Sequence, residues 1–395
     1  MKRLLIDYLR NHAIRTAYLE DRKLIEIFID YKENGSQVGY IINGVVRNIL
    51  PSGFAFIDIG QAKNAFMNLP SDTNIKPGQY IPVQVRKDAT GDKGANVSEC
   101  LQFNGRLAVL YPSSSQEVGI SQKIASSNER KRLRKLTKRL LPTGYGVILR
   151  TNSANTTERD LQDEFDYLTS LCAATLHNAL YSTAPYVLYR GNSLLDDLLS
   201  DDIEEIIINA PEEMTDIKQA VSARVPSLLS RVRLWDEVKE STTLFDAYDI
   251  EQQIAKALHR NIWLPCGGFV TFDQTEACIV IDVNTGKFAG KKNYRETVLR
   301  ANLEAAACVA AQIALRNLSG MIIVDFIDME DEVDKRQLIN VFDQALAKDR
   351  IRSQIVGMTQ LGLVQLTRRK KREPLSRLLE QVCPHCNGTG RISKH

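Results

Sequence analysis

The sequence contains no apolar run that approaches the ~20 residues needed to span a bilayer, and no signal-peptide pattern follows Met1-Lys2-Arg3. We therefore expect a cytoplasmic protein with no membrane span. The net charge is only +3, which excludes a polycation, so any affinity for nucleic acid must come from local patches. Cysteines are few, and five of the seven are scattered, several of them in apolar stretches. This distribution is typical of reduced thiols packed as small hydrophobic groups.

The chain is nevertheless long enough for a sizeable hydrophobic core. Its 395 residues are 44% hydrophobic, which indicates a globular protein of about two to four domains. Residues 277–329 have the pattern strand, helix, strand. The runs CIVI and MIIV are typical of buried strands. Between them, residues 294–318 are rich in Ala and Leu, contain no Pro or Gly, and end against Ser319-Gly320.

Each of these two predicted strands stops on a carboxylate, Asp282 or Asp325. In a right-handed βαβ unit the strands are parallel neighbours, so both ends meet at one edge of the sheet. Two carboxylates there repel each other unless a cation lies between them. Mg²⁺ is the natural candidate, because it prefers oxygen ligands and typically uses one or two carboxylates plus substrate phosphate.

Asn284 lies two residues after Asp282 and is therefore expected on the same face of the strand. Its amide could orient a metal-bound water or a phosphate oxygen. The alternative for Asp282 and Asp325 is that they are strand-end caps or turn residues, a common use of Asp in α/β loops.

Three long segments, in the same order, resemble the ribonuclease E/G endoribonucleases: LPCGGFVTFDQTEACIVIDVNTGKF, TVLRANLEAAACVAAQIALRNLSGMIIVDFIDM and VCPHCNGTG. The resemblance implies a Mg²⁺-dependent endonuclease specific for single-stranded RNA, which cuts AU-rich stretches and leaves 5′-phosphate and 3′-hydroxyl ends. It also implies that Asp282 and Asp325 are the metal ligands and that Asn284 lies beside the scissile phosphate.

The resemblance further implies an α/β and α+β multidomain fold, in which an OB-fold barrel is inserted in a ribonuclease H-like subdomain and a DNase I-like catalytic subdomain follows. The implied units are residues 1–35 (ribonuclease H-like, first part), 36–103 (OB-fold RNA-binding domain), 104–185 (5′-phosphate sensor region), 186–276 (ribonuclease H-like, second part), 277–380 (DNase I-like) and 381–395 (zinc-link).

Two further patterns concern the units outside the catalytic region. MKRLLIDYL and KLIEIFIDY, separated by a polar turn around Glu20-Asp21-Arg22, predict a hairpin that must join a sheet made by later chain. Residues 186–276 alternate strand-like segments (YVLYR, EEIIINA, SRVRLWDE) with helical patterns, which is typical of an α/β unit. We identify no cluster of carboxylates there that would require a metal.

Five short strands within residues 38–101 predict a small barrel, for which the OB-fold is the favoured interpretation. The order of the motifs G-x-V-x-x-I-x-P, A-F-I-D-I-G and A-F-M resembles the RNA-binding domain named after ribosomal protein S-one. Phe56 and Phe66 would then stack on bases, a contact worth roughly 1–3 kcal/mol per base, and Lys93 would pair with the backbone. The alternative is that both phenylalanines belong to the barrel core.

Residues 130–139 (RKRLRKLTKR) predict a helix with seven basic residues and a leucine stripe. We interpret it as a solvated helix face rather than a phosphate-tracking patch. The resemblance assigns the Arg-Thr pair ending the next strand, Arg150 and Thr151, to the 5′-monophosphate of the RNA, with a backbone contact from Val109. A guanidinium fork and a hydroxyl suit a terminal phosphate. The alternative is a surface Arg that begins a loop.

Two motifs lie beyond the second catalytic strand. Asp328 is a candidate to orient Asp325 or a metal-bound water. Residues 367–372 (TRRKKR) place five basic residues in succession, which would attract polyphosphate near a Mg²⁺ site, although a solvated loop is equally consistent.

Cys383 and Cys386 form a Cys-x-x-Cys turn, but structural Zn²⁺ requires four ligands and no second such pair exists. The remaining ligands could come from His385 and a distant group, or from a second chain. A redox couple is disfavoured, because the motif does not open a helix after a strand. The resemblance implies a Zn²⁺ shared by Cys383 and Cys386 of two protomers, hence a homodimer.

Two rival functions follow from the same residues. One is a non-catalytic RNA-binding protein that uses the barrel alone. The other is a phosphatase or DNase with the same carboxylate pair, which would not need an RNA-binding barrel.

Overall fold

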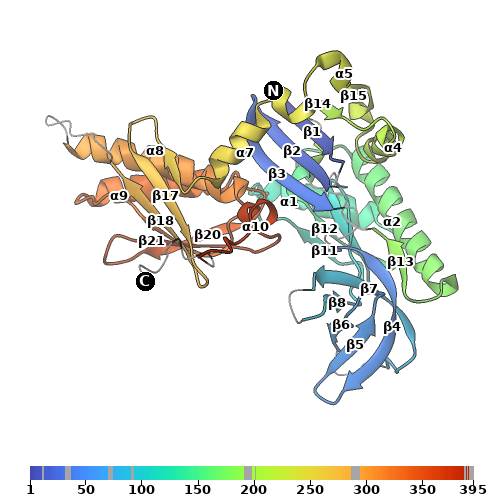
Figure 1. Ribbon diagram of the computed structural model, residues 1–395. Helices are drawn as coiled ribbons and strands as arrows, with labels where there is room; N and C mark the ends of the chain where they lie inside the picture. The colour runs from blue at the N-terminus through green and yellow to red at the C-terminus, as the bar shows by residue number, and fades with distance from the viewer. Residues whose placement is uncertain are drawn as a thin grey trace.

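The computed structural model describes residues 1–10, 13–31, 37–69, 74–89, 93–190, 198–200, 202–285, 294–386, 388 and 390. These residues form a mixed α/β architecture with four sheets, one of which closes into a barrel (Figure 1). One of the helical patterns expected within residues 186–276, LLDDLLS at residues 194–200, lies mostly outside the described residues.

The N-terminal sheet has the strand order β15-β14-β1-β2-β3. Its strands are β1 (Lys2–Tyr8), β2 (Ala13–Glu20), β3 (Lys23–Tyr31), β14 (Ile203–Ile208) and β15 (Val232–Leu234). The first three form an antiparallel meander, and β1 pairs in parallel with β14, so segments some 200 residues apart build one sheet. Leu4 and Ile6 pack on one face and Leu5 on the other. Both faces are therefore buried.

The predicted hairpin of MKRLLIDYL with KLIEIFIDY is wrong. The turn at Asp21 and Arg22 joins β2 to β3, and β2 lies between the two segments that were expected to pair. Both turn residues have positive φ (47° and 67°), as a tight two-residue hairpin turn requires. Because Ala and Thr supply much of the buried surface of β2, its apolar pattern is weak.

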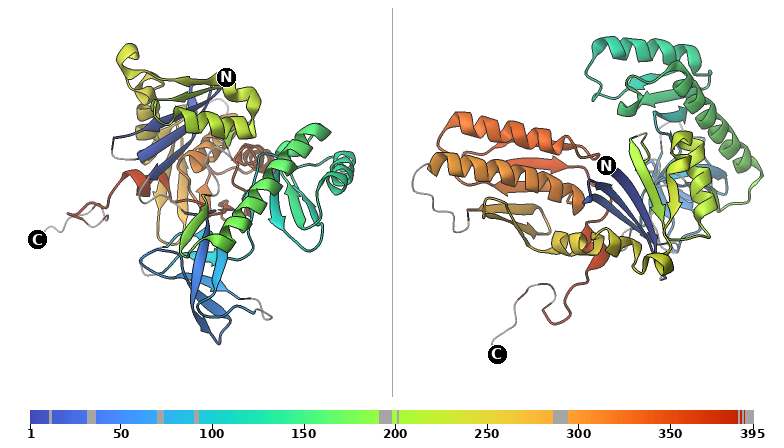
Figure 2. Two further views of the ribbon diagram at one scale, coloured as in Figure 1. Left: turned by 90° about the vertical axis from the view of Figure 1, so that its right-hand side faces the viewer. Right: turned by 90° about the horizontal axis from the view of Figure 1, so that it is seen from above.

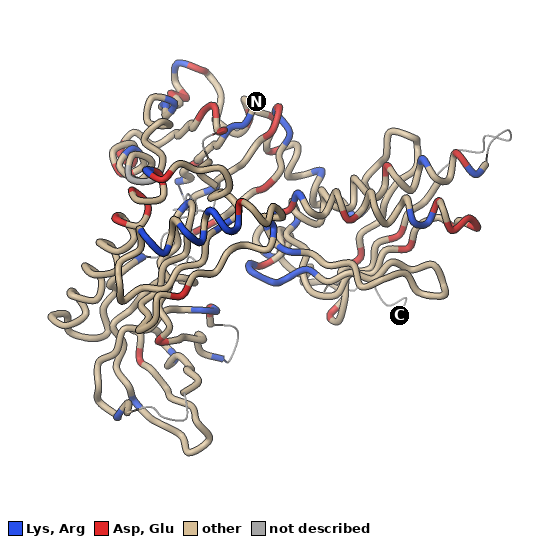
Figure 3. The backbone as a smooth tube through the Cα atoms, turned by 180° about the vertical axis from the view of Figure 1, so that it is seen from behind, with Lys and Arg blue, Asp and Glu red and all other residues tan. Residues whose placement is uncertain are grey.

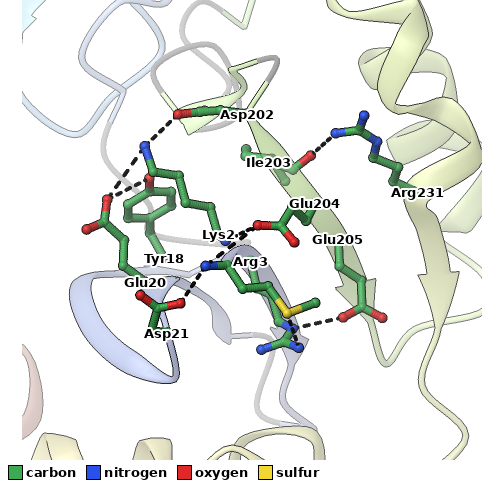
Figure 4. Close-up of polar contacts among 11 residues, drawn as sticks. Lys2, Arg3, Tyr18, Glu20, Asp21, Asp202, Ile203, Glu204, Glu205 and Arg231 are labelled. Atoms are coloured by element: carbon green, nitrogen blue, oxygen red, sulfur yellow. Dashed lines mark hydrogen bonds and ion pairs between the residues drawn. The ribbon is translucent and has the colours of Figure 1, made fainter.

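Ion pairs support the parallel junction between β1 and β14 (Figure 4). Lys2 Nζ lies 2.5 Å from Asp202 Oδ2, and Arg3 Nε lies 3.0 Å from Glu205 Oε2. Helices and turns between and after these strands pack on the sheet: α4 (Met214–Arg224), η2 (Pro226–Arg231), α6 (Leu244–Ala247) and α7 (Ile250–Leu258). The short helix α5 (Glu237–Glu240) has no buried residue.

The barrel contains the five strands predicted for it: β4 (Ile41–Leu50), β5 (Phe54–Asp58), β6 (Ala65–Asn68), β7 (Tyr80–Lys87) and β8 (Asn96–Ser98). The barrel is closed because β4 pairs with both β5 and β7, which is consistent with an OB-fold. The segment YVLYR, expected in the α/β region of residues 186–276, instead forms β13 (Tyr186–Tyr189) and pairs with β4. Its apolar pattern indicates a strand but does not specify the partner sheet.

A third sheet, in the order β11-β12-β10-β9, packs on two helices. Its elements are β9 (Phe103–Asn104), β10 (Ala108–Pro112), β11 (Val118–Ile120), α1 (Ser127–Leu140), β12 (Tyr145–Leu149), η1 (Thr151–Ser153) and α2 (Glu158–Tyr181). A capping box of Thr157 and Asp160 fixes the start of α2. The predicted basic helix is α1, and its Leu133 is fully buried.

The last sheet has the order β16-β17-β18-β19-β21-β20. Its elements are β16 (Asn261–Trp263), β17 (Phe269–Gln274), β18 (Ile279–Asn284), α8 (Tyr294–Leu315), β19 (Gly320–Asp325), α9 (Glu332–Leu346), β20 (Ser353–Met358), β21 (Val364–Arg368) and α10 (Leu375–Leu379). β18 and β19 are parallel with α8 between them in sequence, as predicted. Helices α8 and α9 lie together on one face, where the core is (Figures 1 and 2). The opposite face carries no described helix of this unit.

By length and composition alone, helix α8 is long and apolar enough to cross a membrane. Inspection of the sequence did not predict this candidate membrane span. Half of its most apolar stretch is buried, and its Ala305, Val309 and Ile313 lie in the core beside the sheet. Its packing is that of the core helix of a globular unit.

Arginine side chains join this sheet to the N-terminal one. Arg350 and Arg372 pair with the buried Glu26 of β3 at 3.0 and 3.5 Å. Burial raises the pKa of Glu26, and the two guanidinium groups act against that rise. Each of these arginines also lies over an aromatic ring of the N-terminal sheet. The two sheets are therefore coupled by charge and by packing.

Candidate active site

The carboxylates at the ends of β18 and β19 lie side by side. The parallel register pairs Asp282 directly with Asp325, and paired residues in neighbouring strands lie about 4.8 Å apart along the hydrogen-bonding direction. Both side chains are exposed, whereas Ile281 and Val324 beside them are fully buried. The strand-helix-strand pattern predicted this juxtaposition correctly.

Negative charge is concentrated at this pair. The pKa of Asp325 is raised above its ordinary value, chiefly by partial burial and then by the charges of Asp282 and Asp328. Asn284 donates from Nδ2 to Asp282 Oδ2 at 2.6 Å. This hydrogen bond fixes the orientation of one carboxylate and places the predicted amide next to the pair.

A buried asparagine, which the sequence did not reveal, holds the loop after Asp325. Asn302 of α8 is fully buried, donates from Nδ2 to Ile327 O at 2.8 Å and accepts from Ile327 N at 3.0 Å. This two-bond clamp sets the path of the chain between Asp325 and Asp328. Asn is a poor residue for the interior of a helix, so its occurrence in the Ala-rich run was a sequence feature that could have pointed to this role.

The loop before β17 supports Asn284 from the other side. Glu304 of α8 accepts from Cys266 N at 2.8 Å. At Gly268 an added Cβ would lie 2.5 Å from Asn284 O, so only glycine permits this approach of the two backbones. Helix α8 therefore positions both sides of the site, through Asn302 and Glu304.

The donors present fit Mg²⁺ better than a softer ion. Within the described ranges, no group of three or more His, Cys, Asp or Glu side chains gathers as a metal site. Two adjacent carboxylates and an amide supply hard oxygen ligands, which suits an ion that keeps several waters. The two carboxylates lie side by side, so a cation between them would relieve their repulsion.

The predicted stacking residues lie on the outside of the barrel. Phe56 and Phe66 are half-buried, with ring centroids 6.4 Å apart, and Phe54 lies 4.8 Å from Phe66. The interior is formed by the alternate residues of β5, such as Ala55 and Ile57, which are fully buried. The phenylalanines are therefore not the barrel core. An aromatic surface of this kind can accept bases.

Lys93 is exposed and precedes β8, whose Asn96 pairs with Phe66. Lys93 is therefore three residues from the position that pairs with Phe66.

Arg150 and Thr151 follow β12. Arg150 donates from Nη1 to Gly105 O at 2.9 Å. Glu164 of α2 accepts from Leu107 N at 2.7 Å in the same turn, and burial raises the pKa of this glutamate. The sequence did not reveal Glu164, because a partly buried glutamate in a helix has the same local sequence pattern as an exposed one.

Thr151 is exposed and lines a cavity of about 610 Å³ beside the start of α1. Val109 lies within β10, paired with Ile148 on one side and Asn104 on the other. Thr151 is thus accessible, whereas Val109 lies between two neighbouring strands of the sheet.

Most of the positive charge on α1 faces outward, and Figure 3 shows Lys and Arg along the length of this helix. Some of it is neutralised within the chain, since Arg132 pairs with Glu129 at 2.7 Å and Arg139 pairs with Glu158. Arg130 donates a hydrogen bond to Ser121 O at 2.6 Å. No aromatic residue lies within α1. The interpretation of α1 as a solvated helix face stays a prediction.

The basic run at residues 367–372 is divided between the interior and the surface. Arg368 is buried and bonds Asp349 Oδ2 at 2.7 Å, and Arg372 lies over the ring of Phe28. Lys371 and Arg369 are exposed. Arg368 therefore acts inside the last unit, and Arg372 acts in the packing of that unit against the N-terminal sheet.

Cys383 and Cys386 lie after α10, on a segment that leads away from the sheets (Figure 2). Cys383 is exposed, and Gly390 N donates to Cys386 Sγ at 3.3 Å. The thiolate is the form of cysteine that binds metal. The two thiols provide half of a tetrahedral site.

Comparison with known proteins gives one consistent similarity. A sequence model of the Ribonuclease E/G family matches residues 102–371. Ribonuclease G of Salmonella typhimurium (strain SL1344) is 33% identical over 404 aligned positions, which cover 96% of this chain and 82% of the relative. Ribonuclease G of Escherichia coli (strain K12) is 32% identical with the same coverage. Ribonuclease E of Synechocystis sp. (strain PCC 6803) is 36% identical over 96% of this chain and 59% of its own length.

Proposed function

The chain belongs to the Ribonuclease E/G family, and on that premise we propose that it is a Mg²⁺-dependent endoribonuclease that hydrolyses phosphodiester bonds in single-stranded RNA. The observation that carries the proposal is the pairing of Asp282 with Asp325 on a sheet face that no described helix of its unit covers. RNA strands can reach both carboxylates there, because the side chains are exposed.

Asp282 and Asp325 would hold the ion. When bound, Mg²⁺ supplies Lewis acidity that lowers the pKa of a water and offsets charge on the phosphate. Asn284 keeps one carboxylate in position through its 2.6 Å hydrogen bond, and its amide lies where it can contact a phosphate oxygen. Asp328 adds negative charge beside Asp325 and would orient a water of the site. The products would carry 5′-phosphate and 3′-hydroxyl ends.

The remaining units would bind the strand. We assign the closed barrel as an OB-fold, the N-terminal sheet as a ribonuclease H-like subdomain and the last sheet as a DNase I-like subdomain. Phe56 and Phe66 offer an aromatic surface for bases, with Lys93 beside it. Arg150 and Thr151 would bind a 5′-monophosphate, which would stimulate cleavage, with a backbone contact from Val109. We place the protein in the cytoplasm.

We further propose a homodimer through a shared Zn²⁺. Cys383 and Cys386 provide two of the four ligands that structural Zn²⁺ requires, and a second protomer would provide the same two across a symmetric interface. The position of this segment away from the sheets (Figure 2) leaves it accessible to a second copy.

The test is cleavage of a short single-stranded RNA carrying either a 5′-monophosphate or a 5′-hydroxyl. We expect internal cuts by the wild type in the presence of Mg²⁺, faster with the monophosphate, and none by Asp325→Asn. The matched control is Asp343→Asn, an exposed aspartate on α9, which should cut normally. Thr151→Val should lose the preference for the monophosphate while still cutting the 5′-hydroxyl RNA.

The outcomes separate the rival functions. Binding of RNA without cleavage by any variant would replace the enzyme with an RNA-binding protein. Equal cleavage of single-stranded DNA, with DNA competing as well as RNA, would favour a broader phosphodiesterase.

A further inference from the structure

One of the two tryptophans is exposed on the sheet that carries the proposed catalytic pair. Trp263 of β16 is 71% exposed, whereas Trp235 is 7% exposed. An isolated exposed apolar side chain is ordinary on a protein surface, so exposure alone indicates nothing. The position of Trp263 in the sheet is what distinguishes it.

Trp263 lies in one row with the predicted site. The antiparallel registers pair Trp263 with Phe269 of β17, and Phe269 with Asn284 of β18. Directly paired residues project from the same face of a sheet, and residues two apart along a strand do so as well. Trp263, Phe269, Asn284 and Asp282 therefore share the open face. Two strand spacings place the backbone of Trp263 about 10 Å from that of Asn284.

The tryptophan has firm support. Its ring packs on that of Phe269, with centroids 5.3 Å apart and planes inclined by 58°. The turn after it is closed by a hydrogen bond from Leu264 N to Gly268 O at 2.8 Å. At the other end of the strand pair, Arg260 and Asp273 form two hydrogen bonds of 2.6 and 2.8 Å. The indole is thus held on a rigid strand pair, which lowers the entropy lost when a ligand contacts it.

We propose that Trp263, backed by Phe269, stacks on a base of the RNA about one or two nucleotides from the scissile phosphate. The proposal rests on the proposed function, which places that phosphate at Asp282 and Asp325. A strand that lies across the open face with its phosphate there passes over β17 and β16. An aromatic face accepts any base, and an unpaired base stacks without first leaving a duplex. Trp263 thereby favours single-stranded substrates at the catalytic sheet itself.

This surface is distinct from the aromatic surface of the barrel. Phe56 and Phe66 belong to the sheet of β5 and β6, whereas Trp263 and Phe269 belong to the catalytic sheet. Loss of Trp263 should therefore impair the positioning of the bond that is cut, beyond any effect on the overall retention of the strand.

Tryptophan fluorescence tests the contact without cleavage. Asp325→Asn protein is titrated with a 5′-phosphorylated single-stranded RNA, and binding is followed in parallel by the anisotropy of a labelled strand. We expect quenching that saturates with binding, and its loss in the double variant Asp325→Asn, Trp263→Phe. The buried Trp235 supplies a constant background. Unchanged fluorescence at saturation would overturn the proposal.

Kinetics and base removal test the consequence. Trp263→Ala should lower kcat/KM about five- to 150-fold, the range expected for loss of one base–aromatic stack, whereas Trp263→Phe should retain most activity. The matched control is Tyr181→Ala, a residue of α2 that is 77% exposed. An abasic nucleotide at one position flanking the cut should slow the wild type and leave Trp263→Ala unaffected. Equal slowing of both proteins at every position would refute stacking.

The two proposals fail separately. If the wild type cuts RNA but its tryptophan fluorescence does not respond, the stacking proposal is wrong and the enzyme stands. If the wild type does not cut but RNA quenches Trp263, the proposed activity is wrong and the contact stands.

Discussion

Replacement of Asp325 by Asn should abolish cleavage and at the same time stabilise the protein when Mg²⁺ is absent. Asp282 and Asp325 are paired on neighbouring strands, and the neighbouring charges, with partial burial, raise the pKa of Asp325. The two carboxylates are held side by side in the folded protein, where like charges repel each other more than in the unfolded chain. Asn has nearly the same shape and no charge, so it removes the repulsion and keeps the packing.

The size of the gain follows from the separation of the two residues. Two unit charges about 5 Å apart interact by roughly 1 kcal/mol in a water-like medium and by about 3 kcal/mol at an effective dielectric constant of 20. Both side chains are exposed, so solvent screening favours the lower figure. A gain of about 1 kcal/mol corresponds to a rise in Tm of about 2 °C for a protein of this size.

Thermal unfolding with EDTA, and then with millimolar Mg²⁺, tests this reasoning. The wild type should gain more from Mg²⁺ than the variant, because a ligand stabilises only the state that binds it. Asp343→Asn on α9, which removes one exposed charge far from the pair in sequence, controls for the change in net charge. A variant that melts lower than the wild type in EDTA, or equal stabilisation of both by Mg²⁺, would refute the metal site.

Three further outcomes are expected. Asn302→Ala leaves both backbone groups of Ile327 without their partner. The free energy of unfolding, measured by urea unfolding, should therefore fall by about 2 to 4 kcal/mol, and kcat, measured by RNA cleavage, should fall as well. Phe56→Ala should weaken binding of single-stranded RNA by about 1 to 3 kcal/mol in a filter-binding assay, with little change in Tm, since the ring is half-exposed. Arg132 lowers the pKa of Glu129 to about 2 from 4.5, so the stability that Glu129→Gln removes is fully present above pH 4.5 and is lost as pH falls toward 2. After allowance for exposure, we expect the variant to lose about 1 kcal/mol of unfolding free energy at pH 7, measured by chemical unfolding. A difference between variant and wild type that persists at pH 2 would contradict the assignment.

The catalytic strands could be predicted from the sequence because their signals are local. Residues 278–281 and 321–324 are apolar runs of strand length, a single helix separates them, and right-handed crossover leaves one arrangement for such a unit. The side-chain alternation of a strand then decides the face: Ile281 and Val283 are buried, and Asp282 between them is exposed. Position and orientation of both carboxylates therefore follow from the pattern.

The pairing of more distant strands could not be predicted in the same way. Strand β13 has a clear apolar pattern but pairs with β4, some 140 residues earlier, and β2 intervenes between two strands of stronger pattern. A strand's sequence encodes its faces rather than its partner, since backbone hydrogen bonds are the same for every neighbour. Only packing of the complete sheet decides between partners.

The residues that support the site were missed for the same reason. Asn302 and Glu304 lie on α8, yet their partners, Ile327 and Cys266, lie on loops from either side of it in the chain. A polar residue in a helix has the same local sequence whether it contacts solvent or clamps a loop. The sequence therefore reveals groups that carry the chemistry more readily than groups that hold them in place.

The proposed catalytic groups and the proposed RNA-binding groups lie on different sheets of the protein. The carboxylates and Trp263 lie on one rigid sheet, held by α8 from its covered face, whereas Phe56 and Phe66 lie on the barrel. The catalytic sheet is also joined to the N-terminal sheet through Glu26 and its arginines. Changes on the barrel should therefore alter mainly KM, because they weaken the ground state and the transition state equally. Changes in the row from Trp263 to Asp282 should alter kcat, because these side chains would contact the RNA beside the bond that breaks.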